Sequence, residues 1–407
     1  MAANKLSRGQ IRSAIMSRAR FFRLGQEVDA LEIPYIDADV HPMTRRGVAD
    51  ILPYVSPSWR RRIEIYRSWS PAGRRPSPVA DVSTGANFAQ DAWSPDGSRP
   101  GSDPVHVRSH LLDARNVLNA ILLPQETIYL SALAAIDDGI EMFRAYNDYF
   151  IAEWLAVDSR YRLALSVSPH DPQAAAAEIK RLQDTPGVVA VLLPLINILM
   201  GHRHYYPIYE AAEAAGLPVV IHPGSGGSDF QGGPTCAGGI PANYFQFQTL
   251  FSELAMSSVV SLVLEGTFQR FPGLKVVMAE FGFTWVPHVI WRMDREWRSL
   301  RVETPWLDRP PSEYMHEHIT YTTQPFDEPE PFEQMLEVMD MIKAQDVLLF
   351  SSDYPHWDNE FPDNTLNKFP ADLQRRIAYE NALRVFPRLT RPAGLPTASA
   401  ASLMKST

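Results

Sequence analysis

The sequence predicts an α/β fold, a closed (β/α)8 barrel of the TIM type with a long insertion after its first strand. Eight short apolar runs alternate with helix-like segments, which is typical of a parallel sheet covered on both faces. Acids and histidines follow several runs, and a closed barrel brings the carboxyl ends of its strands to one mouth. A doubly wound open sheet is the alternative, but no glycine-rich phosphate fingerprint follows the first strand. The predicted strands are 34–41, 117–123, 163–168, 188–193, 218–222, 275–280, 319–322 and 347–351.

The helix-like segments lie between most of these strands, and one more follows the eighth. Residues 68–104 are rich in Pro, Gly, Ser and Asp, and a loop this long is usually functional or mobile. We therefore predict that 44–110 is an insertion over the barrel mouth, where Trp69 and Trp93 could exclude water. The predicted helices are 135–157, 172–183, 205–215, 245–271, 284–300, 328–343 and 371–386.

The two ends of the chain are expected to lie outside the barrel, which we assign to 34–386. Residues 1–33 carry basic side chains with no acid before Glu27, which predicts a helical arm on the body or on a partner subunit. A transit or membrane-surface segment is the alternative. Residues 387–407 are rich in Ala, Ser and Pro and predict a flexible tail.

Composition excludes several classes of protein. The net charge of −9 offers no basic surface for nucleic acid. A single cysteine excludes a disulfide framework and a cysteine-based zinc site. No apolar run approaches the roughly 20 residues that span a bilayer, and no signal peptide opens the chain. We expect a cytoplasmic homo-oligomer, a dimer or higher, whose partner is a small-molecule substrate and neither nucleic acid nor membrane.

Three predicted strands end in residues that can bind a metal. The first is Ile-Asp-Ala-Asp-Val-His, in which Asp39 and His41 share a face roughly 7 Å apart along the strand. The fifth ends at His222 and the eighth leads to Asp353. Taken singly, His222 could be a hydrogen-bonded core histidine and Asp353 a helix cap or turn residue. Their recurrence at strand ends favours a metal site.

The motifs, taken in order, resemble the amidohydrolase superfamily. Residues 37–41 look like its opening motif, usually D-x-H-x-H, with Asp in place of the first His. The similarity is greatest to the branch that contains aminocarboxymuconate-semialdehyde decarboxylase and related metal-dependent hydrolases. It runs from about residue 36 to 386 and includes the segments 271–277, 285–287, 292–294, 352–356 and 381–386.

The resemblance implies a single divalent metal bound by four side chains, with Asp37 a structural residue beneath them. Two imidazoles and two carboxylates leave the open coordination that catalytic sites keep, so the metal can activate water and polarise a substrate oxygen. Zinc is favoured, with manganese or iron as alternatives. Asp353 is also the expected proton acceptor from the bound water. The implied ligands are Asp39, His41, His222 and Asp353.

Two further residues are candidates for catalysis. Relatives are expected to carry histidine at the end of strand six, where this chain has Glu280. A glutamate could bind the metal, act as a base or hold a substrate donor, or it could only cap the next helix. His356 lies three residues after Asp353 and could reach the mouth, although a surface-loop role is the alternative.

The predicted function is therefore metal-dependent hydrolysis of a small aromatic or cyclic amide, lactone or carbon–carbon substrate. An ionised Glu280 cannot donate a proton, which favours attack by a metal-bound hydroxide over decarboxylation. The alternative is a non-oxidative carboxy-lyase acting on an aromatic or dienoic acid. A barrel that only binds a ligand is the third candidate, which four competent ligands disfavour.

Overall fold

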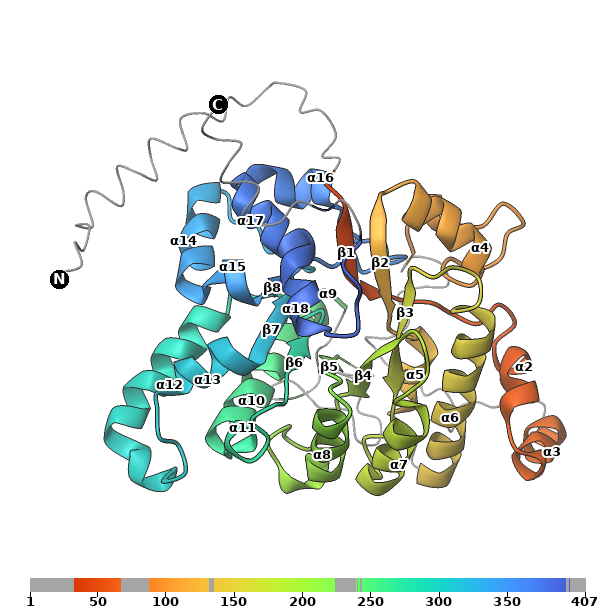
Figure 1. Ribbon diagram of the computed structural model, residues 1–407, viewed down its shortest axis with the longest axis horizontal. Helices are drawn as coiled ribbons and strands as arrows, with labels where there is room; N and C mark the ends of the chain where they lie inside the picture. The colour runs from red at the N-terminus through yellow and green to blue at the C-terminus, as the bar shows by residue number, and fades with distance from the viewer. Residues whose placement is uncertain are drawn as a thin grey trace.

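The structure is a computed structural model that describes residues 33–66, 88–131, 135–223, 239, 241, 244–392 and 395. Eight parallel strands form one sheet in chain order, with helices lying outside it (Figure 1). The predicted (β/α)8 barrel is confirmed. The strands are β1 (Tyr35–Val40), β2 (Val117–Leu122), β3 (Tyr161–Ser166), β4 (Val188–Pro194), β5 (Val219–His222), β6 (Val276–Met278), β7 (Ile319–Thr322) and β8 (Leu348–Leu349).

The barrel closes where its first strand meets the segment that follows its last. The backbone N–H of Ala38 donates to the carbonyl of Phe350 (3.0 Å), and that of Asp353 donates to the carbonyl of Asp39 (3.1 Å). Both faces of the sheet are covered, because six of the eight strands are buried along their whole length. The closure places the ends of β1 and β8 side by side.

Helices follow the strands as the sequence predicts, and local caps fix several of their starts. Asp171 accepts hydrogen bonds from the backbone N–H groups of Gln173 and Ala174, and a proline opens the helix behind it. The helices around the sheet are α5 (Gln125–Leu130), α6 (Ile136–Glu153), α7 (Pro172–Leu182), α8 (Tyr206–Ala214), α9 (Tyr244–Thr249), α10 (Phe251–Leu264), α11 (Thr267–Arg270), α12 (Val286–Leu300), α13 (Pro311–His318), α14 (Phe332–Ile342), α15 (Ala344–Val347), α16 (Pro362–Thr365), α17 (Ala371–Arg375) and α18 (Asn381–Val385).

One predicted helix, 245–271, is divided in the structure. Gly266 adopts a left-handed conformation (φ 76°) between α10 and α11, which ends the longer helix there. The stretch Phe245–Leu264 has a mean hydropathy of 1.5 and is long and apolar enough to cross a membrane by length and composition. The prediction that no run approaches that length is therefore wrong. Half of the stretch is buried inside the fold, as in the core helix of a barrel.

The insertion after β1 contains α2 (Val48–Ile51), α3 (Pro57–Tyr66) and α4 (Pro104–Val107) among the described residues. Its returning part meets the loop after β8, where Phe88 forms an antiparallel bridge with His356. Gly101 packs against β1 so closely that a Cβ there would lie 2.7 Å from the carbonyl oxygen of His41. Residues 88–110 therefore lie at the carboxyl ends of the strands. Trp69 and most of the predicted arm and tail lie outside the described residues.

Candidate metal centre

The four predicted ligands lie together at the carboxyl ends of β1, β5 and β8. His41 Nε2 is 3.0 Å from Asp39 Oδ1 and 3.1 Å from Asp353 Oδ1. His222 Nε2 is 3.7 Å from Asp39 Oδ2. Metal–ligand bonds of about 2.1 Å separate neighbouring ligand atoms by about 3.3 Å in a tetrahedral shell, so the spacing fits one shared cation.

The same atoms lack partners within the described part of the chain. Both carboxylate oxygens of Asp39 and the Nε2 atoms of His41 and His222 are buried without a hydrogen bond. Burying polar atoms without partners is costly, and such groups in a folded protein call for a ligand, water or ion. The donor set of carboxylate oxygens and imidazole nitrogens suits a divalent cation.

The opposite nitrogen of each histidine is held by the backbone. His41 Nδ1 donates to the carbonyl of Leu123 (2.9 Å), and His222 Nδ1 donates to that of Pro223 (2.7 Å). These bonds place the hydrogen on Nδ1 and leave Nε2 with its lone pair directed at the cluster. Backbone acceptors of this kind orient the histidines of many metal sites.

Asp37 lies beneath the cluster and joins the first strand to the segment after β8. Its carboxylate accepts hydrogen bonds from the backbone N–H of Ser352 (2.9 Å) and from the Ser352 hydroxyl (2.6 Å). It also accepts one from the N–H of Asp39 (3.3 Å). Burial raises the pKa of Asp37 to about 7 despite these donors. The contacts agree with the structural role that the resemblance implies.

The carboxylates and imidazoles of the cluster shift one another's pKa values. Burial disfavours the charged form of each group, yet the Asp39 carboxylate raises the pKa of His41 well above its ordinary value. Burial likewise opposes charging of His222, but the nearby carboxylates of Asp39 and Glu280 raise its pKa to about 9. The two imidazoles hold the pKa of Asp39 far below its usual range against the effect of burial. A divalent cation would displace protons from this cluster.

Glu280 follows β6 and faces His222, with its Oε2 3.0 Å from His222 Nε2. Its backbone is left-handed (φ 60°) and its N–H donates to Thr322 Oγ1 (3.1 Å). Asp353 has the same unusual φ of 60°. Non-glycine residues rarely adopt this conformation, and such residues cluster at functional sites. Burial, and then the charge of Asp353, raise the pKa of Glu280.

His356 contacts Asp353 directly. Its Nδ1 lies 2.7 Å from Asp353 Oδ1, and its ring lies 4.9 Å from that of His41. Phe88 of the insertion stacks on the other side, with ring centroids 6.1 Å apart. Burial lowers the pKa of His356, but the Asp353 carboxylate outweighs it, so the pKa lies above its ordinary value. The pair combines a buried carboxylate with an imidazole that reaches solvent.

Sequence reasoning missed polar residues on the β7 and β8 loops. Gln324 follows β7 and is 1% exposed, with its amide oxygen unpartnered within the described residues. Glu360 accepts a hydrogen bond from the N–H of Phe326 (2.9 Å), and burial raises its pKa to about 8. Burial and the charge of Asp353 raise the pKa of Asp358 to about 7. The sequence carried no signal that could have identified Gln324, because it follows the polar residues Thr322 and Thr323.

Two histidines of the insertion lie near the site without joining it. His110 Nδ1 is 3.1 Å from the hydroxyl of Tyr354, and its ring stacks on His106 at 5.3 Å. His170, after β3, contacts the carbonyl of Ser131 instead (2.6 Å). These contacts favour supporting roles for all three.

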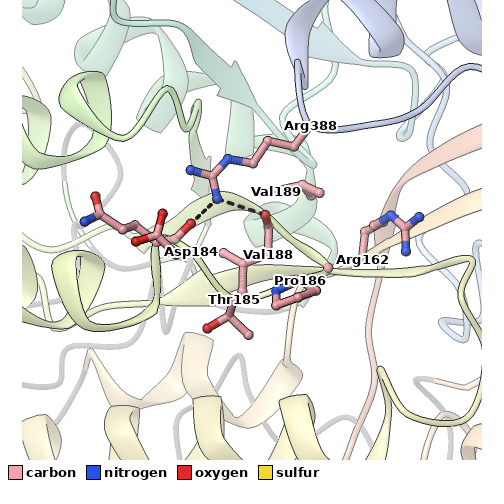
Figure 2. Close-up of a pocket in the computed structure, with 9 residues that line it drawn as sticks. Arg162, Asp184, Thr185, Pro186, Val188, Val189 and Arg388 are labelled. Carbon is pink, nitrogen blue, oxygen red and sulfur yellow. Dashed lines mark hydrogen bonds between the residues drawn. The ribbon is translucent and has the colours of Figure 1, made fainter.

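A separate pocket of about 470 Å³ lies at the opposite end of the barrel, where β3 and β4 begin (Figure 2). Arg388 reaches into it and donates to the carbonyls of Gln183 and Val188, as the dashed lines show. Its other donor binds the carbonyl of Ala215 (2.7 Å). No candidate ligand lines this pocket, so it is not the metal centre. The lining residues are Arg162, Gln183, Asp184, Thr185, Pro186, Gly187, Val188, Val189 and Arg388.

The sequence is similar to a family of known proteins. A family model described as Amidohydrolase matches residues 36–388. The chain belongs to the amidohydrolase family. Gamma-resorcylate decarboxylase of Polaromonas sp. strain JS666 is 25% identical over 324 residues, which cover 71% of this chain and 92% of the relative. The predicted resemblance to the superfamily and to its decarboxylase-containing branch is confirmed.

Solved structures share the fold. A dihydroxybenzoic acid decarboxylase from Polaromonas sp. JS666, with manganese and 2-nitroresorcinol bound, matches with a TM-score of 0.59 at 19% identity. The match covers 89% of this chain and 99% of that one. The 5-carboxyvanillate decarboxylase from Sphingomonas paucimobilis also gives a TM-score of 0.59, at 20% identity, over 87% and 99% of the two chains.

The prediction that hydrolysis is the main reaction is wrong, because the curated relatives are decarboxylases. The error lay in the weight given to Glu280, which stands where relatives are expected to carry histidine and cannot donate a proton when ionised. The structure brings His356 to 2.7 Å from Asp353, so an imidazole also lies near the candidate ligands. Binding of a divalent metal is supported by the donor cluster, whereas the preference for zinc is not, since the related structure contains manganese.

Proposed function

We propose that this chain is a metal-dependent, non-oxidative decarboxylase of a hydroxylated aromatic acid. The observation that carries the proposal is the Asp353–His356 pair beside the donor cluster, in a barrel whose curated relatives are gamma-resorcylate decarboxylases. The reaction needs a place for the carboxylate and a proton for the ring carbon. Both requirements are met by side chains at one end of the barrel.

The metal ligands in this proposal are the four residues of the cluster. A divalent cation there would supply a Lewis acid for the oxygens of the substrate carboxylate and a neighbouring hydroxyl. Manganese is the cation we favour, because imidazole and carboxylate ligands suit it and the related decarboxylase binds it. Asp39, His41 and His222 form one possible donor group, and His41, Asp353 and His356 form another. The ligands we propose are Asp39, His41, His222 and Asp353.

Proton transfer falls to Asp353 and His356. In the reaction, the bond between ring carbon and carboxyl carbon breaks, CO₂ leaves, and the electron pair left on the ring carbon takes a proton. Asp353 is 1% exposed, so it faces substrate, while His356 is 15% exposed and can exchange protons with solvent. The 2.7 Å contact between them lets His356 replace the proton that Asp353 delivers.

Glu280 has a different role in this proposal. Its carboxylate lies 3.0 Å from His222, which holds that imidazole in place and adds negative charge beside the cation. Glu280 is 13% exposed, so one face of the carboxylate remains open to substrate. A hydrogen-bond donor on the substrate would find an acceptor there.

The test is turnover of manganese-loaded protein in D₂O with 2,6-dihydroxybenzoate, 5-carboxyvanillate and other hydroxylated aromatic acids. We expect one CO₂ per substrate consumed and one deuterium at the ring carbon that carried the carboxyl group. Chelation of the metal should abolish the reaction, and Arg388→Met, at the far end of the barrel, should not affect it. Absence of CO₂ from every acid, or ¹⁸O from labelled water in a product carboxylate, would overturn the proposal.

The division into an arm, a barrel with an insertion at 44–110 and a tail remains a prediction, as does assembly into a homo-oligomer. Support for the insertion comes from its returning part, where the N–H of Ala89 donates to the carbonyl of Pro355 (3.0 Å) beside His356. We propose that this part covers the side of the mouth where Phe88 stacks on His356.

A further inference from the structure

Gln324 stands apart from the other polar residues that follow the strands. It lies two residues beyond the end of β7, is 1% exposed, and its amide oxygen has no hydrogen-bond partner in the described ranges. A glutamine that only holds the fold together normally bonds its amide to the backbone. The side chain of Gln324 makes no such bond through its oxygen.

The backbone around Gln324 is fixed from both sides. Its N–H donates to Ser351 Oγ (3.1 Å), and its carbonyl accepts from Thr322 Oγ1 (3.3 Å). Thr322 Oγ1 also accepts the N–H of Glu280 (3.1 Å). The backbone contacts therefore secure the loop without help from the side-chain amide, and they position that side chain between the ends of β6 and β8.

Strand alternation gives the direction of Thr322, the last residue of β7. Tyr321 packs on Trp285, which immediately precedes α12 outside the barrel, so Thr322 lies on the opposite face of the strand. Gln324 lies beyond the end of β7, and its backbone hydrogen bonds to Ser351 and Thr322 place it at the mouth, beside the Glu280 N–H that Thr322 also binds.

The surroundings of Gln324 are rich in acceptors. Glu360 has one oxygen bound to the N–H of Phe326 and the other buried without a partner within the described residues. The charge of Glu280 acts on the carboxyl group of Asp358, so these two acids, which follow β6 and β8, lie near one another. A site lined by acceptors is complementary to a ligand group that donates hydrogen bonds.

We propose that Gln324 is a specificity-determining residue whose amide oxygen accepts a hydrogen bond from a ring hydroxyl of the aromatic acid. This inference rests on the proposed function and adds the residue that recognises a hydroxyl substituent of the aromatic ring. The hydroxyl concerned is one that does not bind the metal, and its single hydrogen is donated to Gln324. An analogue without that hydroxyl leaves a buried acceptor unpaired and therefore binds more weakly.

The test compares two ligands that differ by one hydroxyl, 2-nitroresorcinol and 2-nitrophenol, by calorimetric titration of the manganese-loaded protein. We expect wild type to bind 2-nitroresorcinol about 10-fold more tightly or better, from the usual cost of an unpaired buried acceptor. Gln324→Met keeps the length of the side chain without the acceptor and should bring the ratio close to one. Gln324→Glu keeps the acceptor and should retain most of the preference.

The matched control is Gln334→Met on the exposed face of α14, which should keep the wild-type ratio. No preference in wild type, an unchanged ratio in Gln324→Met, or equal loss in Gln324→Met and Gln324→Glu would overturn the inference. Because binding is measured without turnover, a changed ratio in a protein that releases no CO₂ would defeat only the proposed function. Decarboxylation with an unchanged ratio would defeat only this inference.

Discussion

The two ends of the barrel use charged side chains in opposite ways. At the end where the strands begin, Arg388 donates to the carbonyls of Gln183, Val188 and Ala215, so its donors are used within the protein. At the end where they finish, Asp39 and the ligand histidines are buried with atoms that bond to nothing in the described chain. The hydrogen bonds of Arg388 stabilise the fold. The buried atoms of Asp39 and the ligand histidines, which form no hydrogen bonds in the described chain, are available to bind a ligand.

The largest expected effect is a loss of decarboxylation activity, caused by substitution at the end of the barrel that holds the candidate metal ligands. Asp353→Asn removes the proposed proton carrier and one ligand charge with little change in volume. We expect decarboxylation to fall by about 10²–10⁴-fold, the usual contribution of a general acid or base. Rates should be measured at matched metal occupancy, and the circular dichroism spectrum should match wild type. Activity within a few-fold of wild type would place the proton carrier elsewhere.

Metal affinity should depend strongly on pH at the same end. The pKa of His222 is raised to about 9 and that of His41 lies well above its ordinary value, so both imidazoles carry protons at neutral pH without metal. A cation must displace them, and its affinity should fall by up to about 10-fold per pH unit for each proton released. Competition titrations of manganese from pH 9 to pH 6 measure this slope. A flat profile would contradict the assignment of these ligands.

A substitution at the end of the barrel where the strands begin should lower the stability of the protein and leave metal binding unchanged. Arg388→Met removes three donated hydrogen bonds and leaves carbonyl oxygens that need water. We expect a loss of about 1–3 kcal/mol in the free energy of unfolding. Urea denaturation of the metal-free variant gives this value. Manganese affinity should equal that of wild type, and a weakened metal site would show that the two ends are coupled.

An effect on stability of similar size and opposite sign is expected from Glu360. Its pKa is raised from 4.5 to about 8, so the unfolded chain loses this proton at lower pH than the folded one. The folded state is therefore penalised progressively between about pH 4.5 and 8, and fully above that range. Glu360→Gln should match or fall slightly below wild type at pH 4 and exceed it by roughly 1–3 kcal/mol at pH 9. Equal stability at both pH values would show that the carboxyl titrates normally.

The sequence predicted the strands because they depend on local pattern, whereas the set of ligands was implied by the resemblance to the amidohydrolase superfamily. Apolar runs mark buried parallel strands, and the period of two in β1 places Asp39 and His41 on one face. Contacts that arise from barrel closure could not be obtained in this way. His356 meets Asp353 and Phe88 only because the loop after β8 folds against the insertion.

Two errors have a physical explanation. The role of Glu280 was predicted from its own ionisation alone. In the structure Glu280 contacts His222 and lies near His356, and these two imidazoles influence its protonation. The helix predicted over 245–271 was too long because a glycine in left-handed conformation outweighs apolar composition at one position, Gly266. Gln324 was missed because an isolated polar residue after a strand has no chemical signature until its unpaired oxygen is seen.

The central claim is that the residues at the carboxyl ends of the strands bind one divalent cation. The most direct test is anomalous diffraction from crystals of the manganese-loaded protein, recorded on both sides of the manganese absorption edge. The account predicts a single peak within about 2.3 Å of ligand atoms of Asp39, His41, His222 and Asp353. No peak there at full manganese loading, or a peak held by Asp353 and His356 without Asp39 and His222, would contradict it.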